Sequence, residues 1–476
     1  MLAPFLIAAS IAGGGVVPAP DVPLPNVLIV LVDDLGYGDL GAGLVGMPGV
    51  EHHRTPHLAA FSAESLVLTH GYSAAPNCAP SRATLQTGRL TPRHGVITVG
   101  ASARGKAKNR RLVPVQNQTV LADEEVTLAE QLRGAGYSSM HLGKWHLGED
   151  PCTQGYDHNV GGTKAGHPKS YFAPYRNVPL EAEEGEHLTT RLTDEAIAGL
   201  DRLEPPFLMH LAYYTVHTPL QAAPERVTER MEAGVKGKRH ATYAAMVEGL
   251  DAEFGRLMAA LEERGLKEST LVLFTSDNGG QGSVTNTQPL RGFKGTLDEG
   301  GIRVPWMVRL PGRITPRVDE TPVHHADLLP TLAGIAGVEP EASVVDGADL
   351  GGLWFEGRPL AERALLWHFP VYLEGRSDRF PTWRTTPGCA LRLGDTKLVE
   401  YFEDRLDGAR RLELYDLDAD PRESKDRADE DEERVKEMRD ALDAALRRAG
   451  AKVPVTPAPQ PESKAESKRG ASSKGR

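Results

Sequence analysis

The chain has 476 residues, of which 40% are hydrophobic and 25% are charged, as expected for a globular protein with one large domain and a smaller one. Its formal net charge of -11 argues against a general nucleic-acid-binding protein, because such proteins carry an excess of Lys and Arg. Any site for an anion must therefore be a local cationic pocket in an acidic protein.

The N-terminal segment is apolar. Residues 1–20 pass from an apolar stretch into small residues and prolines, the pattern of a secretory signal peptide. The stretch is too short and too rich in glycine for a membrane span, and no later segment has the necessary apolar length. We expect an exported protein, periplasmic or secreted, with no stable membrane span.

Apolar runs that suit buried strands alternate with helical patterns. The strands are predicted at 26–32, 137–142, 207–214 and 271–275. The helices are predicted at 127–134, 241–264 and 327–336. This alternation predicts an α/β sheet with helices on both faces, within a domain spanning residues 22–345. Polar residues follow the strand ends, where ligands bind in such sheets, so distant segments can meet in one crevice.

After about Val345 the pattern changes to short strands separated by turns. These strands are predicted around Trp354 and at 365–369, 390–392, 397–402 and 413–417. A charged amphipathic helix is predicted over 432–448, which completes a smaller α+β domain at 346–450. Residues 451–476 have almost no large apolar side chains and predict a disordered tail.

Cys78 begins the most informative run of the chain. Pro80 and Arg82 follow it at fixed offsets in Cys-Ala-Pro-Ser-Arg. The alternative interpretation is an idle buried thiol, as most isolated cysteines are. The other two cysteines, Cys152 and Cys389, form one bridge or none, because their spacing does not decide the pairing.

Two pairs of oxygen-bearing side chains follow predicted strands. Asp33 and Asp34 come after the first strand, and Asp277 and Asn278 come after the strand at 271–275. Clustered carboxylates repel one another unless a cation lies between them, and oxygen ligands suit Ca²⁺ or Mg²⁺. Turn formation explains either pair alone, but two such pairs favour a metal site.

Cationic and titratable residues follow other strands. Lys144 and His146 are two residues apart, so in an extended segment they point to the same side and suit an anionic substrate. His217 and Lys294 are weaker candidates, because a single histidine is more often structural and a single lysine is often only a charged loop residue.

Together these elements resemble the type I sulfatases of the alkaline phosphatase-like superfamily. The Cys78 run and the run Gly-Lys-Trp-His-Leu-Gly at 143–148 match the two signatures of that family, with Ser139 where the second often has Thr. The resemblance extends from Asn26 into the second domain. It implies an α/β fold with a large central mixed sheet flanked by helices, and a smaller C-terminal α+β domain.

The resemblance also implies a modified nucleophile. In that family the cysteine is oxidised by a formylglycine-generating or equivalent maturation enzyme, and the Cα-formylglycine hydrates to a gem-diol. Cys78 would be that residue and Arg82 would hold the diol. A divalent cation, usually Ca²⁺ with Mg²⁺ as the alternative, would be held by a set of five residues. These ligands would be Asp33, Asp34, residue 78, Asp277 and Asn278.

The remaining roles follow from the same resemblance. Lys144 and Lys294 would bind the sulfate oxygens. His217, with Lys294 as a second candidate, would protonate the leaving alcohol. His146 would take the proton of the second diol hydroxyl, so that sulfate leaves and the aldehyde returns.

The expected function is release of sulfate from a sulfate ester, with a sulfated carbohydrate preferred to another small molecule. His94, His368 and Arg376 are candidates for the leaving-group pocket. The alternatives are an aryl sulfate hydrolase, a phosphomonoesterase or phosphodiesterase of the same superfamily, and a catalytically inactive binding protein. The cysteine motif argues against a phosphohydrolase, which would use Ser or Thr as the nucleophile.

Overall fold

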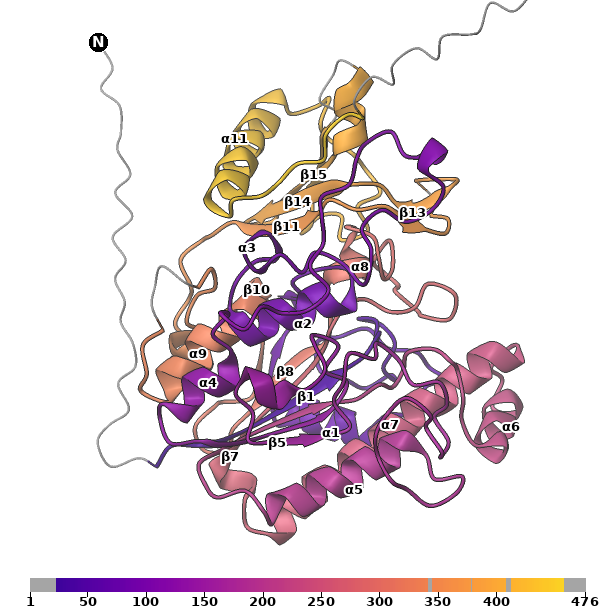
Figure 1. The fold of residues 1–476 in the computed structure, drawn as a ribbon, viewed down its shortest axis with the longest axis vertical. Coiled ribbons are helices and arrows are strands. Elements are labelled where there is room, and N and C mark those ends of the chain that lie inside the picture. Colours follow the sequence, from indigo (N-terminus) through magenta and orange to yellow (C-terminus); the bar gives the residue numbers. More distant parts are fainter. Residues whose placement is uncertain (1–22, 341–344, 378, 408–411, 458–476) are drawn as a thin grey trace, which may run out of the picture.

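The computed structural model describes residues 23–340, 345–377, 379–407 and 412–457. Its centre is an eight-stranded sheet in the order β5-β4-β6-β1-β7-β8-β2-β9 (Figure 1). The strands from β5 to β7 are parallel and β8 is antiparallel to β7, so the sheet is mixed, as predicted. The strands are β1 Asn26–Val32, β2 Leu66–Leu68, β4 Ser138–Gly143, β5 His158–Val160, β6 Phe207–Ala212, β7 Thr270–Ser276, β8 Trp306–Arg309 and β9 Arg317–Asp319.

Helices cover both faces of the sheet, and β1 is therefore buried on both sides. Leu28 and Val30 pack in a core with α5 and α7, whereas Val27 and Ile29 pack in a second core with α2, α4 and α9. This two-residue alternation follows from strand geometry. The helices of this domain are α1 Pro56–Ala63, α2 Cys78–Thr87, α3 Thr91–His94, α4 Leu128–Arg133, α5 Leu188–Leu200, α6 Pro224–Glu232, α7 Lys238–Glu263, α8 Glu299–Ile302, α9 Leu328–Ile335 and α10 Gly351–Glu356.

The predicted strands and helices of this domain are present with small shifts at their ends. Helix α4 begins at the predicted cap, where the Thr127 side chain accepts from the Glu130 backbone and the Glu130 side chain accepts from the Thr127 backbone. The prediction at Trp354 was wrong. This residue lies in α10 with its side chain fully buried, because it packs into the core formed with α9.

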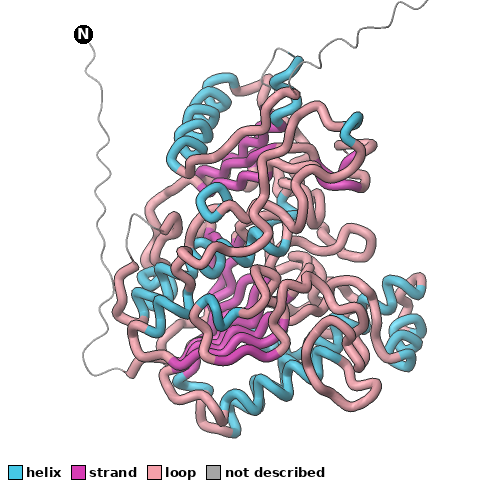
Figure 2. Tube along the Cα trace, viewed as in Figure 1, coloured by secondary structure: helices cyan, strands magenta, loops and turns pink. Residues whose placement is uncertain are grey.

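The C-terminal domain is a four-stranded antiparallel sheet, β11-β14-β15-β16, against which α11 packs (Figures 1 and 2). Its elements are β11 Leu365–Phe369, β12 Leu373–Glu374, β13 Trp383–Thr385, β14 Gly388–Leu393, β15 Thr396–Tyr401, β16 Leu412–Asp416 and α11 Glu432–Arg448. The short pair β3 Gly71–Tyr72 and β10 Val323–His324 forms a separate sheet.

The end of the described chain is packed. Ala451 and Val453 pack against the core of the C-terminal domain, and the exposed Val455 pairs with Val113 through its backbone. The rest of the predicted tail, 458–476, and the predicted signal peptide, 1–20, lie outside the described residues. Among the described residues, none of the helices has the length and apolar character needed to cross a bilayer.

A buried charge cluster joins the two domains. Lys397 on β15 lies 2.9 Å from both Glu299 at the start of α8 and Glu423, and all three side chains are fully buried. Breaking a buried pair by removing one partner costs about 3–5 kcal/mol. The cluster therefore fixes the C-terminal sheet against α8 and against the loop before it, which carries Lys294.

Candidate active site

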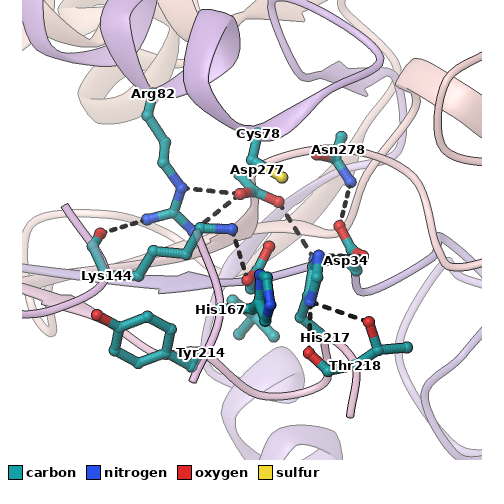
Figure 3. Close-up of polar contacts among 12 residues, drawn as sticks. Asp34, Cys78, Arg82, Lys144, His167, Tyr214, His217, Thr218, Asp277 and Asn278 are labelled. Carbon is teal, nitrogen blue, oxygen red and sulfur yellow. Dashed lines mark hydrogen bonds and ion pairs between the residues drawn. The ribbon is translucent and has the colours of Figure 1, made fainter. Parts of the chain in front are cut away.

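The site lies where four adjacent parallel strands end. Strands β4, β6, β1 and β7 are neighbours in this order, so their carboxyl ends share one edge of the sheet. Lys144 follows β4, Asp33 and Asp34 follow β1, and Asp277 and Asn278 follow β7. His217 lies in the segment after β6. The predicted convergence of these segments is present (Figure 3).

Helix α2 brings the cysteine motif to the same edge. The Asn77 side chain accepts from the backbone N–H of Cys78 at 3.0 Å, so the helix begins at the cysteine. Arg82 is one turn further along and faces the same way. Its Nε donates to Asp277 Oδ2 at 2.8 Å, and another nitrogen donates to the Lys144 carbonyl at 2.6 Å. Arg82 thereby ties α2 to the ends of β7 and β4.

Cys78 is 2% exposed. Lys294 Nζ lies 3.1 Å from its sulfur and 2.6 Å from Asp34 Oδ1. Burial nevertheless raises the pKa of the thiol to about 11, against the influence of Lys144 and Lys294. An unmodified thiol at this position is therefore mostly protonated near neutral pH and is a weak nucleophile.

Three buried oxygens in the site have no hydrogen-bond partner among the described residues. They are Asp33 Oδ1, Asp34 Oδ2 and Asn278 Oδ1. Ligand atoms of Asp33, Asp34, Cys78 and His217 all lie within 4.8 Å of one another. Unpartnered buried oxygens are costly, and hard oxygen donors suit Ca²⁺ or Mg²⁺. The residues present therefore fit a divalent cation.

The two aspartates after β1 differ in charge balance. Burial raises the pKa of Asp33 well above its usual range, although Lys144 lies beside it. Burial acts in the same direction on Asp34, but Lys294 and His217 outweigh it, so the pKa of that carboxyl lies below its ordinary value. Asp33 thus has the less compensated charge, and a cation would relieve it.

Asp277 is held differently from the other candidate ligands. Its Oδ2 pairs with Arg82 at 2.8 Å, and its Oδ1 accepts from the backbone N–H of Asp34 at 3.2 Å. It therefore orients its neighbours in this structure. Its role as a metal ligand stays a prediction.

Lys144 is fully buried behind the metal candidates, and its Nζ donates to Asp33 Oδ2 at 2.6 Å. Of the two predicted sulfate-binding lysines, only Lys294 lines the pocket. The expected contact of Lys144 with sulfate oxygens stays a prediction, because its ammonium group is paired with Asp33 in this structure.

His146 lines the pocket in a strained conformation, with a φ of 62°. Non-glycine residues at positive φ are uncommon and gather at functional sites. A Cβ at Gly166 would lie 2.5 Å from the His146 ring, so only glycine allows this approach. Burial, Lys144 and Arg82 lower the pKa of His146 well below its usual range, so the ring is neutral, and its expected role as the base stays a prediction.

His217 also lines the pocket. Its Nδ1 lies 2.7 Å from the Thr218 carbonyl, which makes Nδ1 the protonated nitrogen, and its Nε2 lies 3.6 Å from Asp34 Oδ2. The ring of His167 stacks on it at a centroid distance of 5.6 Å. Burial lowers the pKa of His217 to about 3 although Asp34 opposes the shift, so its expected role as the acid stays a prediction.

The pocket above Cys78 has a volume of about 380 Å³ and is open to solvent. The sequence analysis missed several of its lining residues, which lie in loops and in the second domain without a motif. These are Asn77, Val99, Arg104, Gly166, His167, Thr218, Gln281, Leu373, Glu374 and Arg384. Arg384 is the one member of this set with a local signal in the sequence. It lies between Trp383 and Thr385, and this alternation of polarity is typical of a strand with one exposed face.

The three residues expected in the leaving-group pocket lie outside its lining. His94 is buried and bonds Thr84 Oγ1 at 3.0 Å. His368 is buried and lines a separate cavity with Lys452. Arg376 is exposed. The second domain does reach the pocket, but through β12, β13 and Arg384.

The comparison with protein families agrees with this geometry. The Sulfatase family model matches residues 25–338, which is most of the larger domain. The chain belongs to the sulfatase family. Of its relatives, the steryl-sulfatase of Mus musculus is 31% identical over 568 residues, covering 94% of this chain and 84% of the relative. The N-acetylgalactosamine-6-sulfatase of Sus scrofa is 32% identical, covering 76% and 72%.

A solved structure gives the same fold. Ps i-CgsB in complex with k-i-k-neocarrahexaose has a TM-score of 0.73 and 26% identity, and the match covers 89% of this chain and 93% of the other. The sulfatase described here is therefore an enzyme of the alkaline phosphatase-like fold, as the sequence predicted. None of the three cysteines forms a disulfide in this structure, so Cys152 and Cys389 are not bridged.

Proposed function

We propose that this sulfatase hydrolyses the sulfate ester of a sulfated carbohydrate through a formylglycine formed from Cys78. The observation that carries the proposal is the meeting of Cys78, Asp33, Asp34 and His217 within 4.8 Å beside Lys294. The run Cys-Ala-Pro-Ser-Arg at 78–82 and the match to the Sulfatase family model support the modified residue.

In this proposal residue 78 attacks sulfur as the hydrated aldehyde, and the bond from sulfur to the leaving oxygen breaks. Lys294, 3.1 Å from the Cys78 sulfur, balances the negative charge that develops there. His217 is the candidate that passes the proton released by the attacking hydroxyl to the leaving oxygen. His146 accepts the proton of the second hydroxyl, so that sulfate leaves and the aldehyde returns with net consumption of one water.

The side chains of Asp33, Asp34 and Asn278 would hold the divalent cation, because each has an unpartnered buried oxygen. Asp277 would complete the set. When bound, the ion supplies a positive charge that lowers the pKa of a nearby hydroxyl and draws the sulfate group into place. Ca²⁺ is preferred to Mg²⁺ because its coordination is the more flexible.

The sulfated-carbohydrate substrate is supported by relatives. Ps i-CgsB binds k-i-k-neocarrahexaose, and another relative is an N-acetylgalactosamine-6-sulfatase. An aryl sulfate is the second candidate substrate, because human arylsulfatase A is 31% identical over 89% of this chain. The apolar segment 1–20, outside the described residues, supports export to the periplasm or medium.

The proposed function predicts a modified peptide and a preference for sulfate over phosphate. The tryptic peptide that contains residue 78 should show the mass of an aldehyde or its hydrate when the host contains the maturation enzyme. Paired sulfate and phosphate esters of the same alcohol then separate a sulfatase from a phosphohydrolase. An active enzyme with only the thiol form of the peptide, or faster release of phosphate, would contradict the proposal.

Cation binding should be measurable without any substrate. Ca²⁺ at about 100 times its dissociation constant should raise the free energy of unfolding by about 2.7 kcal/mol. Asp34→Asn should remove most of this gain, whereas Asn in place of the exposed Asp418 should leave it intact. Scanning calorimetry in chelator, Ca²⁺ and Mg²⁺ measures the effect. Melting curves that do not respond to either ion would exclude the site.

A further inference from the structure

Two arginines of the pocket have no part in the proposed chemistry. Arg384 on β13 and Arg104 in the segment after α3 line the same pocket as Cys78 and Lys294. In the described part of the chain, neither arginine forms an ion pair. The nearby Arg291, in contrast, pairs with Asp298 at 2.7 Å. Burial of a charged side chain usually requires a partner, so two partly buried arginines without ion pairs at one pocket suggest an anionic ligand.

Arg384 is held against the loop that carries Lys294. Its guanidinium carbon lies 5.8 Å from the centre of the Phe293 ring, and one terminal nitrogen lies 3.4 Å from the Lys294 carbonyl. Gly295 has a φ of 91°, and a Cβ there would lie 2.6 Å from Arg384 Cδ. The Arg384 side chain therefore packs against Phe293 and Gly295, the residues on either side of Lys294. These contacts fix its guanidinium group next to the proposed sulfate position.

Among the described residues, the guanidinium group of Arg104 hydrogen-bonds to backbone carbonyls and to no acidic side chain. Its Nε donates to the Ala101 carbonyl at 3.3 Å, and a terminal nitrogen donates to the Val99 carbonyl. Burial lowers the pKa of Arg384; the negative charge of Asp34 opposes this shift, and the positive charge of Arg104 adds to it. Two like charges that face one pocket repel each other, and a bound anion removes the repulsion.

Glu374 is the one acidic side chain among the residues that line this pocket. It is exposed, and it forms no ion pair with either arginine among the described residues. Its charge is therefore screened by solvent and does not neutralise Arg104 or Arg384.

We propose, on the basis of the sulfatase function above, that Arg384 and Arg104 form a second anion-binding subsite beside the scissile sulfate. The preferred substrate is then a sulfate ester whose leaving group carries a second sulfate or a carboxylate, as in a polysulfated or uronate-containing glycan. Guanidinium groups suit both anions, because their planar fork donates two parallel hydrogen bonds.

The test uses phenyl sulfates with a carboxylate, a sulfonate or a neutral carboxamide at the meta or para position. The kcat/KM of each charged ester is divided by that of the carboxamide, so that changes common to all three cancel between variants. In Arg384→Gln this ratio should fall about tenfold or more, because charge-assisted hydrogen bonds are lost, with most of the change in KM. The charged ester whose kcat/KM ratio falls further in Arg384→Gln identifies the anion that the subsite prefers.

Three further variants sharpen the test. Arg384→Lys keeps the charge without the fork and should give an intermediate ratio, and Arg104→Gln should lower the ratio in the same direction. Lys106→Gln removes a charge from an exposed residue in the segment that carries Arg104, outside the pocket lining, and should leave the ratio unchanged. An equal ratio in the wild type, Arg384→Gln and Arg104→Gln would overturn the subsite.

A binding measurement separates this proposal from the sulfatase function itself. Calorimetric titration of the Cys78→Ala protein with the same esters needs no turnover. The charged esters should bind about tenfold more weakly or worse after Arg384→Gln, and the carboxamide should not change. If the wild type releases no sulfate but this difference is present, the subsite holds and the proposed function fails. Equal binding with normal turnover overturns the subsite alone.

Discussion

Cys78→Ala should reduce sulfate release by about 10⁴-fold or more, because removal of a nucleophile that acts with its partners costs rates of this order. Alanine lacks the Cβ–sulfur bond that is broken when the cysteine is oxidised to the aldehyde, so the variant has no route to the proposed nucleophile. The side chain is 2% exposed and lies at the first turn of α2, where alanine is tolerated. Continuous assay of sulfate release, with circular dichroism as a check on folding, measures the effect.

Cys152→Ala is the matched control. Cys152 is an exposed free cysteine away from the pocket, so its loss removes a thiol without touching the site. We expect this control to retain full activity. Turnover by the folded Cys78→Ala protein at more than a few per cent of the wild-type rate would show that residue 78 is not the nucleophile.

The central sheet was predictable because its strands are buried on both faces. Such strands appear in the sequence as uninterrupted apolar runs, and β1 and β7 were found almost residue for residue. The meeting of the polar residues that follow these strands was predictable for a second reason, because neighbouring parallel strands end at the same edge of the sheet. The order of the strands across the sheet, in contrast, depends on contacts between distant segments and leaves no local pattern.

The mouth of the pocket was not predictable in the same way. His167 and Arg384 lie in segments whose sequence shows only turns or a short strand, and only tertiary packing brings them beside Cys78. His368 was expected there because it lies early in the second domain, but its side chain turns inward and is 3% exposed. A histidine in a strand points to either face, and the sequence alone does not distinguish the two.

The strand prediction at Trp354 was wrong for a related reason. Its apolar neighbours fit a short strand as well as a short helix, and runs of this length are ambiguous by periodicity. Packing of its side chain in the core formed with α9 favours the helix over the strand. Local sequence therefore predicts elements of the large sheet better than the short elements between the domains.

Lys294→Met should lower kcat/KM for sulfate esters by about 10³-fold, the loss expected when one preorganised donor is removed from a developing negative charge. Lys294 is the residue that touches both the sulfur of Cys78 and the carboxylate of Asp34 while lining the pocket. The variant should also be less stable in chelator, because Asp34 keeps a buried charge with one fewer cation beside it.

The two effects of Lys294→Met should separate when a divalent cation is added. Ca²⁺ restores the charge balance around Asp34, so the melting temperature should return towards the wild-type value, while activity stays low because no ammonium faces the reacting sulfate. Lys425→Met removes an exposed lysine that pairs with Glu430 at 3.0 Å and should change neither quantity. Recovery of activity together with stability in Ca²⁺ would mean that Lys294 acts only on the charge balance of the site and not on the transition state.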